Sequence, residues 1–146
     1  MNTFLLDVNV LIALAWPDHS AHRLVQRWFA RTGCHSWATC PFTEAAFVRI
    51  LSNPSFSERA VTPAEALDAL RISTRRTGHH FWTDDVSFEE AVRTFQGRIA
   101  GHQQVTDAYL LGLVLHRKGR LATLDRAILA LLSDHPQRDV LEVISA

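Results

Sequence analysis

The sequence predicts an α/β fold with a central, mostly parallel β-sheet of about five strands flanked by helices. Short runs rich in β-branched and aromatic residues alternate with longer segments whose apolar residues recur at helical spacing. This alternation is typical of parallel sheets, because each parallel strand needs a crossover connection, usually a helix. The 146 residues suit one core, and contents of 47% hydrophobic and 21% charged residues are ordinary for a globular domain.

The predicted strands are short apolar runs that end at turn signals or at the start of a helical pattern. In chain order they are Thr3–Leu6, His35–Thr39, His79–Thr83, Arg120–Thr123 and Val140–Ile144. Helical spacing fills the intervals between them. The predicted helices are a short one after Asp7, then Ser20–Arg31, Phe42–Leu51, Pro63–Arg75, Phe88–Phe95, Asp107–Arg117 and Arg126–Leu132.

Several helices carry start or stop signals. Thr62 and Ser87 each precede a glutamate by three residues, a spacing typical of a capping box at a helix start. Gly33, Gly78 and Gly119 follow helical runs and suit C-terminal caps. The segment 97–104 carries no strand pattern and is predicted to be a loop.

Charge and composition exclude several classes of protein. The formal net charge is zero, so attraction to a nucleic acid would need a local basic patch or a bound metal. The longest apolar runs fall short of the roughly 20 residues needed to cross a bilayer, and Asp7 interrupts the segment where a signal peptide needs an apolar core. Cys34 and Cys40 match neither a zinc site nor a disulfide framework. We expect a cytoplasmic protein with reduced thiols and no membrane contact.

Four carboxylates occur in a shared context, each near the start of a predicted helix: Asp7, Glu44, Asp107 and Asp125. Asp7 and Asp125 come directly after apolar strands, and Glu44 follows one by a few residues. The carboxyl ends of parallel strands share one edge of the sheet, where ligands usually bind, so these three acids can meet there. Asp107 follows a loop and not a strand, so its place in the group rests on the parallel with the others.

Each acid on its own is better explained as a helix cap, because acids at helix starts gain about 0.3 to 1 kcal/mol from the helix dipole. Together the acids are harder to explain in this way. Carboxylates gathered at one edge repel each other by roughly 4 kcal/mol per pair at about 4 Å with an effective dielectric near 20. A cation must neutralise them, and hard oxygen ligands suit Mg²⁺ or Mn²⁺.

The segments LLDVNVLIAL, TEAAFVRIL, VTDAYLLGLVL and LATLDRAI, in this order, resemble a PIN-domain ribonuclease, specifically the VapC-type toxin of a VapBC toxin–antitoxin pair. Each segment is a weak signal alone, but the four together span almost the whole chain. The resemblance implies a single PIN-like domain over residues 1–146. It also implies a metal-dependent endoribonuclease that is inhibited by a cognate antitoxin and forms a homodimer.

By the resemblance, the catalytic residues are Asp7, Glu44, Asp107 and Asp125. Asp7, Asp107 and Asp125 would hold Mg²⁺ or Mn²⁺, and Glu44 would be a ligand or assist proton transfer. Asn9 and Thr106 stand at supporting positions: Asn9 could bond an aspartate or cap a helix, and Thr106 is expected to be a helix N-cap.

Other interpretations remain open. In a non-catalytic PIN-fold binding module, the acids would serve only as helix caps. In a phosphohydrolase of haloacid-dehalogenase type, Asp7 would be the nucleophile, but that family's motif expects a second aspartate where this chain has Asn9. Asp84 and Asp85, just before Ser87, are interpreted as a turn. They also follow a predicted strand, and so compete with the assigned acids for a place in the site.

Overall fold

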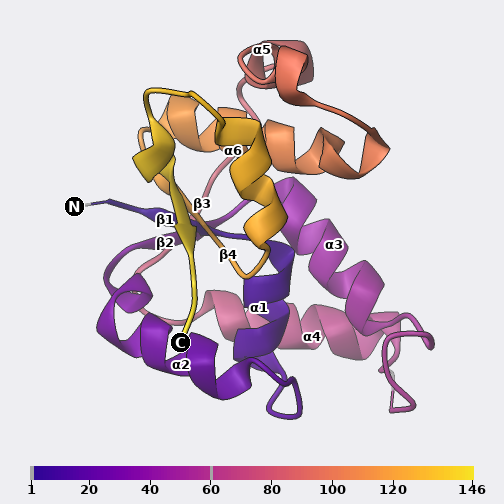
Figure 1. The fold of residues 1–146 in the computed structure, drawn as a ribbon. Helices are drawn as coiled ribbons and strands as arrows, with labels where there is room; N and C mark the ends of the chain where they lie inside the picture. The colour runs from indigo at the N-terminus through magenta and orange to yellow at the C-terminus, as the bar shows by residue number, and fades with distance from the viewer. Residues whose placement is uncertain (1, 60) are drawn as a thin grey trace.

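The computed structural model describes residues 2–59 and 61–146 and has a five-stranded parallel sheet at its centre (Figure 1). The strands are β1 (Phe4–Leu6), β2 (Trp37–Thr39), β3 (His79–Phe81), β4 (Arg120–Thr123) and β5 (Leu141–Val143). Their order is β3-β2-β1-β4-β5, and each neighbouring pair is parallel. The predicted α/β fold with a mostly parallel sheet is confirmed, although four of the five strands are shorter than predicted.

Helices cover both faces of this sheet (Figure 1). The α-helices are α1 (Val8–Ala15), α2 (His22–Arg31), α3 (Pro41–Leu51), α4 (Pro63–Thr74), α5 (Phe88–Arg93) and α6 (Val105–Arg117). The 3₁₀ helices are η1 (Gly33–His35), η2 (Gln96–Arg98), η3 (His102–Gln104), η4 (Arg126–Leu132) and η5 (Arg138–Val140). Within residues 2–59 and 61–146, every helix is too short or too polar to cross a membrane.

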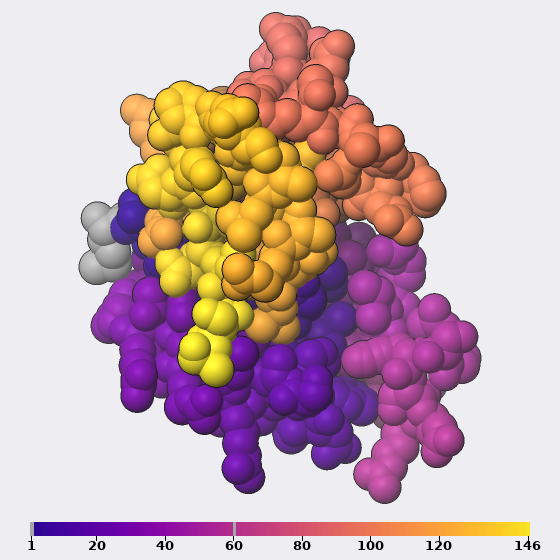
Figure 2. Space-filling model, viewed as in Figure 1, coloured from indigo at the N-terminus to yellow at the C-terminus, as the bar shows by residue number. Residues whose placement is uncertain are grey.

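Side chains alternate between the two faces of each strand, and so build two cores. Phe4 and Leu6 of β1 join the apolar residues of α1 to α4, whereas Leu5 between them joins those of α5 and α6. Leu5 pairs with Ala38 of β2 and with Leu121 of β4, so this register carries the same face across the sheet. The space-filling view shows the orange and yellow C-terminal half lying over the indigo and purple N-terminal half (Figure 2).

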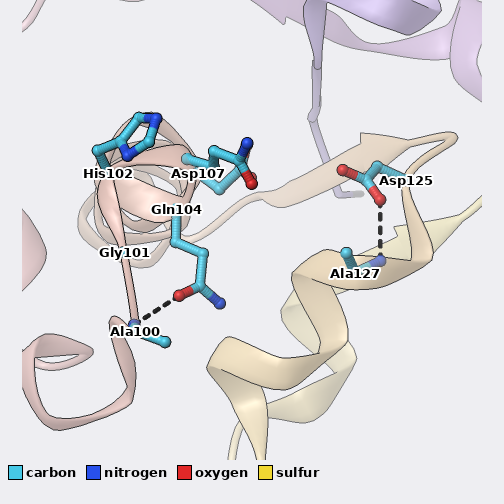
Figure 3. Close-up of a pocket in the computed structure, with 8 residues that line it drawn as sticks. Ala100, Gly101, His102, Gln104, Asp107, Asp125 and Ala127 are labelled. Carbon is cyan, nitrogen blue, oxygen red and sulfur yellow. Dashed lines mark hydrogen bonds between the residues drawn. The ribbon is translucent and has the colours of Figure 1, made fainter.

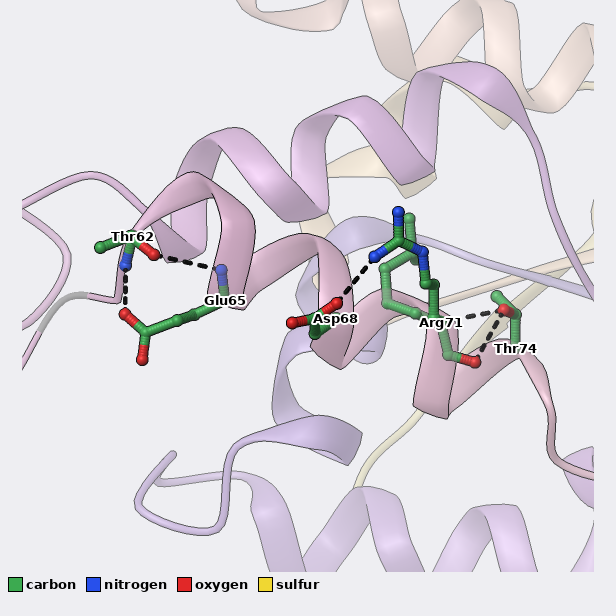
Figure 4. Close-up of polar contacts among 6 residues, drawn as sticks. Thr62, Glu65, Asp68, Arg71 and Thr74 are labelled. Carbon is green, nitrogen blue, oxygen red and sulfur yellow. Dashed lines mark hydrogen bonds and ion pairs between the residues drawn. The ribbon is translucent and has the colours of Figure 1, made fainter.

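The predicted capping signals are present in the structure. Thr62 caps α4: its hydroxyl accepts a hydrogen bond from Glu65 N at 3.1 Å, and Glu65 Oε1 accepts one from Thr62 N at 3.0 Å (Figure 4). Asp68 and Arg71 form an ion pair of 2.7 Å on the exposed face of the same helix. Ser87 caps α5 through one such bond: its hydroxyl accepts a hydrogen bond from Glu90 N at 3.1 Å.

The glycine caps were predicted with mixed success. Gly78 has a φ of +88°, a backbone conformation that favours glycine. At the end of α6 the left-handed residue is Lys118 and not the predicted Gly119, whose N–H bonds back to Val114 O. Gly33 follows the end of α2 by two residues, as predicted, but it begins η1 and has no positive φ.

Two helices near the site differ from the prediction. Residues 126–132 form a 3₁₀ helix and not an α-helix, and its three-residue turn places Ile128 and Leu131 on one buried face. Helix α6 begins at Val105, two residues earlier than predicted. It packs closely against α5 at Gly112, where a side chain would collide with the carbonyl oxygen of Ala91.

Candidate active site

Asp7 lies directly after β1 and is only 6% exposed. Its Oδ1 accepts a hydrogen bond from Val8 N at 2.8 Å, so it caps α1, and its Oδ2 accepts one from Thr123 Oγ1 at 2.7 Å. Burial raises the pKa of the Asp7 carboxyl, against the lowering effect of these hydrogen bonds, and the charge of Asp125 raises it further. Asp7 is thus both a helix cap and a buried carboxylate whose pKa is raised by the nearby charge of Asp125.

Asp125 follows β4 and is exposed. Its Oδ1 accepts a hydrogen bond from Ala127 N at 2.9 Å and so caps η4 (Figure 3). Its own N–H donates to Thr123 Oγ1 at 3.0 Å. The backbone and the side chain of Asp125 are therefore both fixed next to the strand end that holds Asp7.

Asp107 is the third residue of α6 and is half-buried. Burial raises the pKa of its carboxyl to about 6, and the charges of Asp7 and Asp125 contribute to this rise. Three of the predicted acids therefore lie within electrostatic reach of one another. Asp107 and Asp125 face each other across an open cavity of about 540 Å³ that is also lined by residues 100–104 and Ala127 (Figure 3).

The raised pKa of Asp107 predicts a pH-dependent gain in stability for Asp107→Asn. The ordinary pKa of an aspartate is 3.8, so between pH 3.8 and about 6 the folded chain holds a proton that the unfolded chain has lost. The unfolding free energy contributed by this group therefore falls as pH rises through that window. We expect Asp107→Asn to raise the melting temperature of the metal-free protein above pH 6 and to leave it unchanged near pH 4.

Thermal unfolding followed by circular dichroism at several pH values measures this effect. Asp18→Asn removes an exposed carboxylate after α1 and serves as the control. A lower melting temperature for Asp107→Asn at neutral pH would contradict the prediction.

Glu44 lies in the first turn of α3, and its side chain contacts the end of β2. Its Oε2 accepts a hydrogen bond from Thr39 Oγ1 at 2.6 Å. The same hydroxyl is 2.8 Å from His79 Nε2, and the charge of Glu44 acts on that imidazole. The grouping of Glu44 with Asp7 and Asp125 stays a prediction, and Asp107, whose place rested on the parallel with the others, lies within electrostatic reach of both aspartates.

Thr123 is a site residue that the sequence analysis missed. It is completely buried at the end of β4, and its hydroxyl donates to Asp7 and accepts from the backbone of Asp125. Asn9, predicted to support the site, places Nδ2 3.4 Å from Thr123 Oγ1 and accepts from Leu124 N at 3.2 Å. The only sequence signal for Thr123 is its place two residues before Asp125.

Thr106 and Asp85, which the sequence placed in or near the site, lie apart from the three aspartates or lack the predicted role. Thr106 is the exposed second residue of α6, and Gln104 stands at the N-cap, so the predicted capping role of Thr106 is wrong. Asp85 lies 3.3 Å from Arg117 and 3.4 Å from His116. Both partners are at the C-terminal end of α6, about 15 Å along the helix from Asp107 at a rise of roughly 1.5 Å per residue. This pairing separates Asp85 from the aspartates.

The three aspartates match the chemistry of a hard divalent cation. They offer carboxylate oxygens, which Mg²⁺ and Mn²⁺ prefer, and a cation between them would relieve the repulsion that raises the pKa of Asp107. Within residues 2–59 and 61–146, no three His, Cys, Asp or Glu side chains lie close enough to form a complete ligand set. The match between the three aspartates and a divalent cation therefore rests on the type of ligand atom and on charge.

Comparison with known proteins finds relatives over nearly the full chain. The sequence is 43% identical over 142 residues to ribonuclease VapC39 of Mycobacterium tuberculosis, a match that covers 97% of this chain and 99% of the relative. It is 42% identical over 136 residues to ribonuclease VapC38 of the same organism, covering 93% and 94%. A search with family models gives no match.

A solved structure supports the same fold at a lower level of sequence identity. The crystal structure of VapBC2 from Rickettsia felis, bound to a DNA fragment from its promoter, contains a chain that superposes with a TM-score of 0.63. The match covers 98% of this chain and 99% of that chain, with 13% sequence identity. At this identity the likeness concerns the fold.

Proposed function

This chain belongs to the VapC family of PIN-domain ribonucleases, the toxins of VapBC toxin–antitoxin systems, and from that premise we propose that it hydrolyses RNA at an acidic Mg²⁺ or Mn²⁺ site. The observation that carries the proposal is the grouping of the aspartates: Asp107 and Asp125 line one cavity, and the charges of Asp7 and Asp125 both raise the pKa of Asp107. Such an arrangement suits a cation and the phosphate of a nucleic acid.

In this proposal Asp7, Asp107 and Asp125 hold the ion. When bound, the ion would act as a Lewis acid that activates water and offsets charge on the phosphate. Two of the carboxylates are oriented in advance: Thr123 and Val8 hold Asp7, and Ala127 N holds Asp125. Orientation in advance lowers the cost of binding, since fewer rotamers must be fixed when the ion arrives.

The remaining predicted site residues act around this centre. Glu44 assists proton transfer or holds the attacking water, and Asn9 supports the strand end that carries Asp125. The segment 100–104 lines the open side of the cavity, where it can contact the RNA. Thr106, exposed at the start of α6, keeps only a secondary role.

The partners of the protein belong to the same proposal. RNA is the substrate, a cognate antitoxin inhibits the enzyme, and two copies of the chain form a homodimer. The antitoxin is supported by the Rickettsia felis structure, which is of a VapBC pair. A single domain over residues 1–146 and a location in the cytoplasm complete the assignment. Membership of the VapC family removes the dehalogenase alternative.

One observation favours the second candidate, a non-catalytic binding module. Asp7 and Asp125 both cap helices, which by itself would account for aspartates at these positions. The two functions differ in whether the chain consumes RNA and whether it binds a metal ion.

Incubation of the purified protein with end-labelled RNA tests the proposal. We expect internal cleavage with Mg²⁺ or Mn²⁺ and none with EDTA, because a divalent ion must neutralise the carboxylates before a phosphate can approach. Isothermal titration with Mn²⁺ on the same sample gives an independent measure of the site. Absence of cleavage with every metal, together with absence of Mn²⁺ binding, would overturn the nuclease and favour the binding module.

A further inference from the structure

We propose that Thr39 and His79 form a hydrogen-bond relay that positions the Glu44 carboxylate for RNA cleavage. The inference deepens the proposed function and rests on it, since the reaction is the one that the aspartate cluster would carry out. Neither Thr39 nor His79 touches the substrate in this assignment. Both are positioning residues that act through Glu44.

The relay is built by the register of two parallel strands. Trp37 pairs with His79 and Thr39 with Phe81, so Trp37, Thr39 and His79 project from the same face of the sheet. Thr39 Oγ1 lies 2.6 Å from Glu44 Oε2 and 2.8 Å from His79 Nε2. Three side chains from β2, β3 and α3 thus meet at one hydroxyl group.

Counting protons gives the relay a direction. The Thr39 hydroxyl has one hydrogen, which it donates to the carboxylate of Glu44, so it must accept the hydrogen bond from His79. Burial lowers the pKa of His79, against an opposing effect of the Glu44 charge, so the imidazole carries a single N–H at neutral pH. That hydrogen must be on Nε2.

The surroundings hold each member in place. Thr39 is completely buried, and the ring of His79 packs on that of Trp37 with centroids 4.7 Å apart. At the start of α3, Thr43 Oγ1 accepts a hydrogen bond from Cys40 N at 3.0 Å, which fixes the turn that leads to Glu44. A flexible glutamate is thereby held by Oε2, and Oε1 is the oxygen that we assign to the reaction.

One partner would satisfy the buried hydroxyl of Thr39. The second fixes the direction of its proton, because a hydroxyl that accepts from His79 keeps its hydrogen for Glu44. Without the hydrogen bond from His79, the Thr39 hydroxyl could turn its hydrogen away from Glu44. The carboxylate of Glu44 would then be free to rotate. The relay therefore predicts an effect on cleavage that depends on Glu44.

Rates of cleavage of a defined RNA test this dependence. Thr39→Val removes the hydroxyl at nearly constant shape, and we expect kcat to fall about tenfold with KM for RNA unchanged. Thr39→Ser, which keeps the hydroxyl, should restore most of the lost rate. His79→Gln keeps a side-chain N–H donor and should lose less than His79→Leu. His79 lies on the edge strand β3, where substitutions disturb the sheet less than in the middle. The His79 variants therefore test the relay even if Thr39→Val fails to fold.

A double-mutant cycle separates positioning from a general structural role. In a Glu44→Gln background, Thr39→Val should cause no further loss, because its effect passes through the carboxylate. An additive loss in that background would overturn the relay, and so would a full rate for Thr39→Val in the otherwise unchanged protein.

A spectroscopic test does not depend on cleavage and so separates the relay from the nuclease. Nitrogen-15 NMR of the imidazoles at mildly alkaline pH should show His79 as the Nε2–H tautomer, and its Nε2 signal should shift in Thr39→Val. An Nδ1–H tautomer would mean that Thr39 donates to His79, which overturns the relay even if the protein cleaves RNA. An Nε2–H tautomer in a protein that fails to cleave would overturn the nuclease and retain the hydrogen-bond geometry.

Discussion

Asp7→Asn is expected to lower the rate of RNA cleavage by about 10³-fold or more, because Lewis-acid stabilisation of the transition state contributes several kcal/mol and each 1.36 kcal/mol is about tenfold in rate. The asparagine keeps one oxygen that can accept from Val8 or Thr123 but removes the charge that attracts a cation. Single-turnover cleavage of an end-labelled RNA at saturating Mn²⁺ measures the loss. Titration with Mn²⁺ should show weakened binding in parallel.

The same substitution should leave the fold intact. Burial makes the charged form of Asp7 unfavourable, so a neutral side chain of the same shape removes a cost, and we expect an equal or higher melting temperature. Asp18→Asn removes an exposed carboxylate outside the site and is the control for charge alone. An Asp7→Asn protein that is less stable yet still active would show that Asp7 is only the cap of α1.

The positions of the acids along the chain could be predicted because the ends of strands are visible in the sequence. The run before Asp7 ends at a carboxylate inside an apolar segment, and the run RLAT before Asp125 has the predicted bounds of β4. In a parallel sheet these two ends lie on one edge, since β1 and β4 are neighbours. The alternation of strands and helices in the sequence therefore predicts the parallel sheet. The parallel sheet in turn predicts that Asp7 and Asp125 lie at the same edge.

The partners of each acid could not be predicted in this way. Glu44 turns toward Thr39 because the register of β2 and β3 places a hydroxyl and an imidazole beside it, and register between distant strands is not visible in one sequence. Asp107 follows the 3₁₀ helix η3 and not a strand, so its position depends on how α6 packs in the domain, including its close contact with α5. Both outcomes depend on tertiary packing rather than on local pattern.

Thr123→Val tests whether the hydroxyl under the site organises it. Valine matches threonine in shape, so the change removes the donor to Asp7 Oδ2 and the acceptor for Asp125 N with little change in packing. Loss of a hydrogen bond to a buried carboxylate costs about 1 to 3 kcal/mol of stability, so we expect the free energy of unfolding to fall by that amount. We also expect kcat to fall about 10- to 100-fold, the usual effect of removing a residue that orients a metal ligand.

Denaturant unfolding and cleavage rates on the same preparations measure the two effects. Thr3→Val is the matched control, because the Thr3 hydroxyl also makes a side-chain hydrogen bond, 2.7 Å to Ser36 Oγ, but at the amino end of β1. It should lose stability without loss of kcat, since the strand's amino end carries none of the acids. If Thr123→Val and Thr3→Val lost stability alike and both kept the full rate, Thr123 would be a buried structural hydroxyl, and Asp7 would hold its position without it.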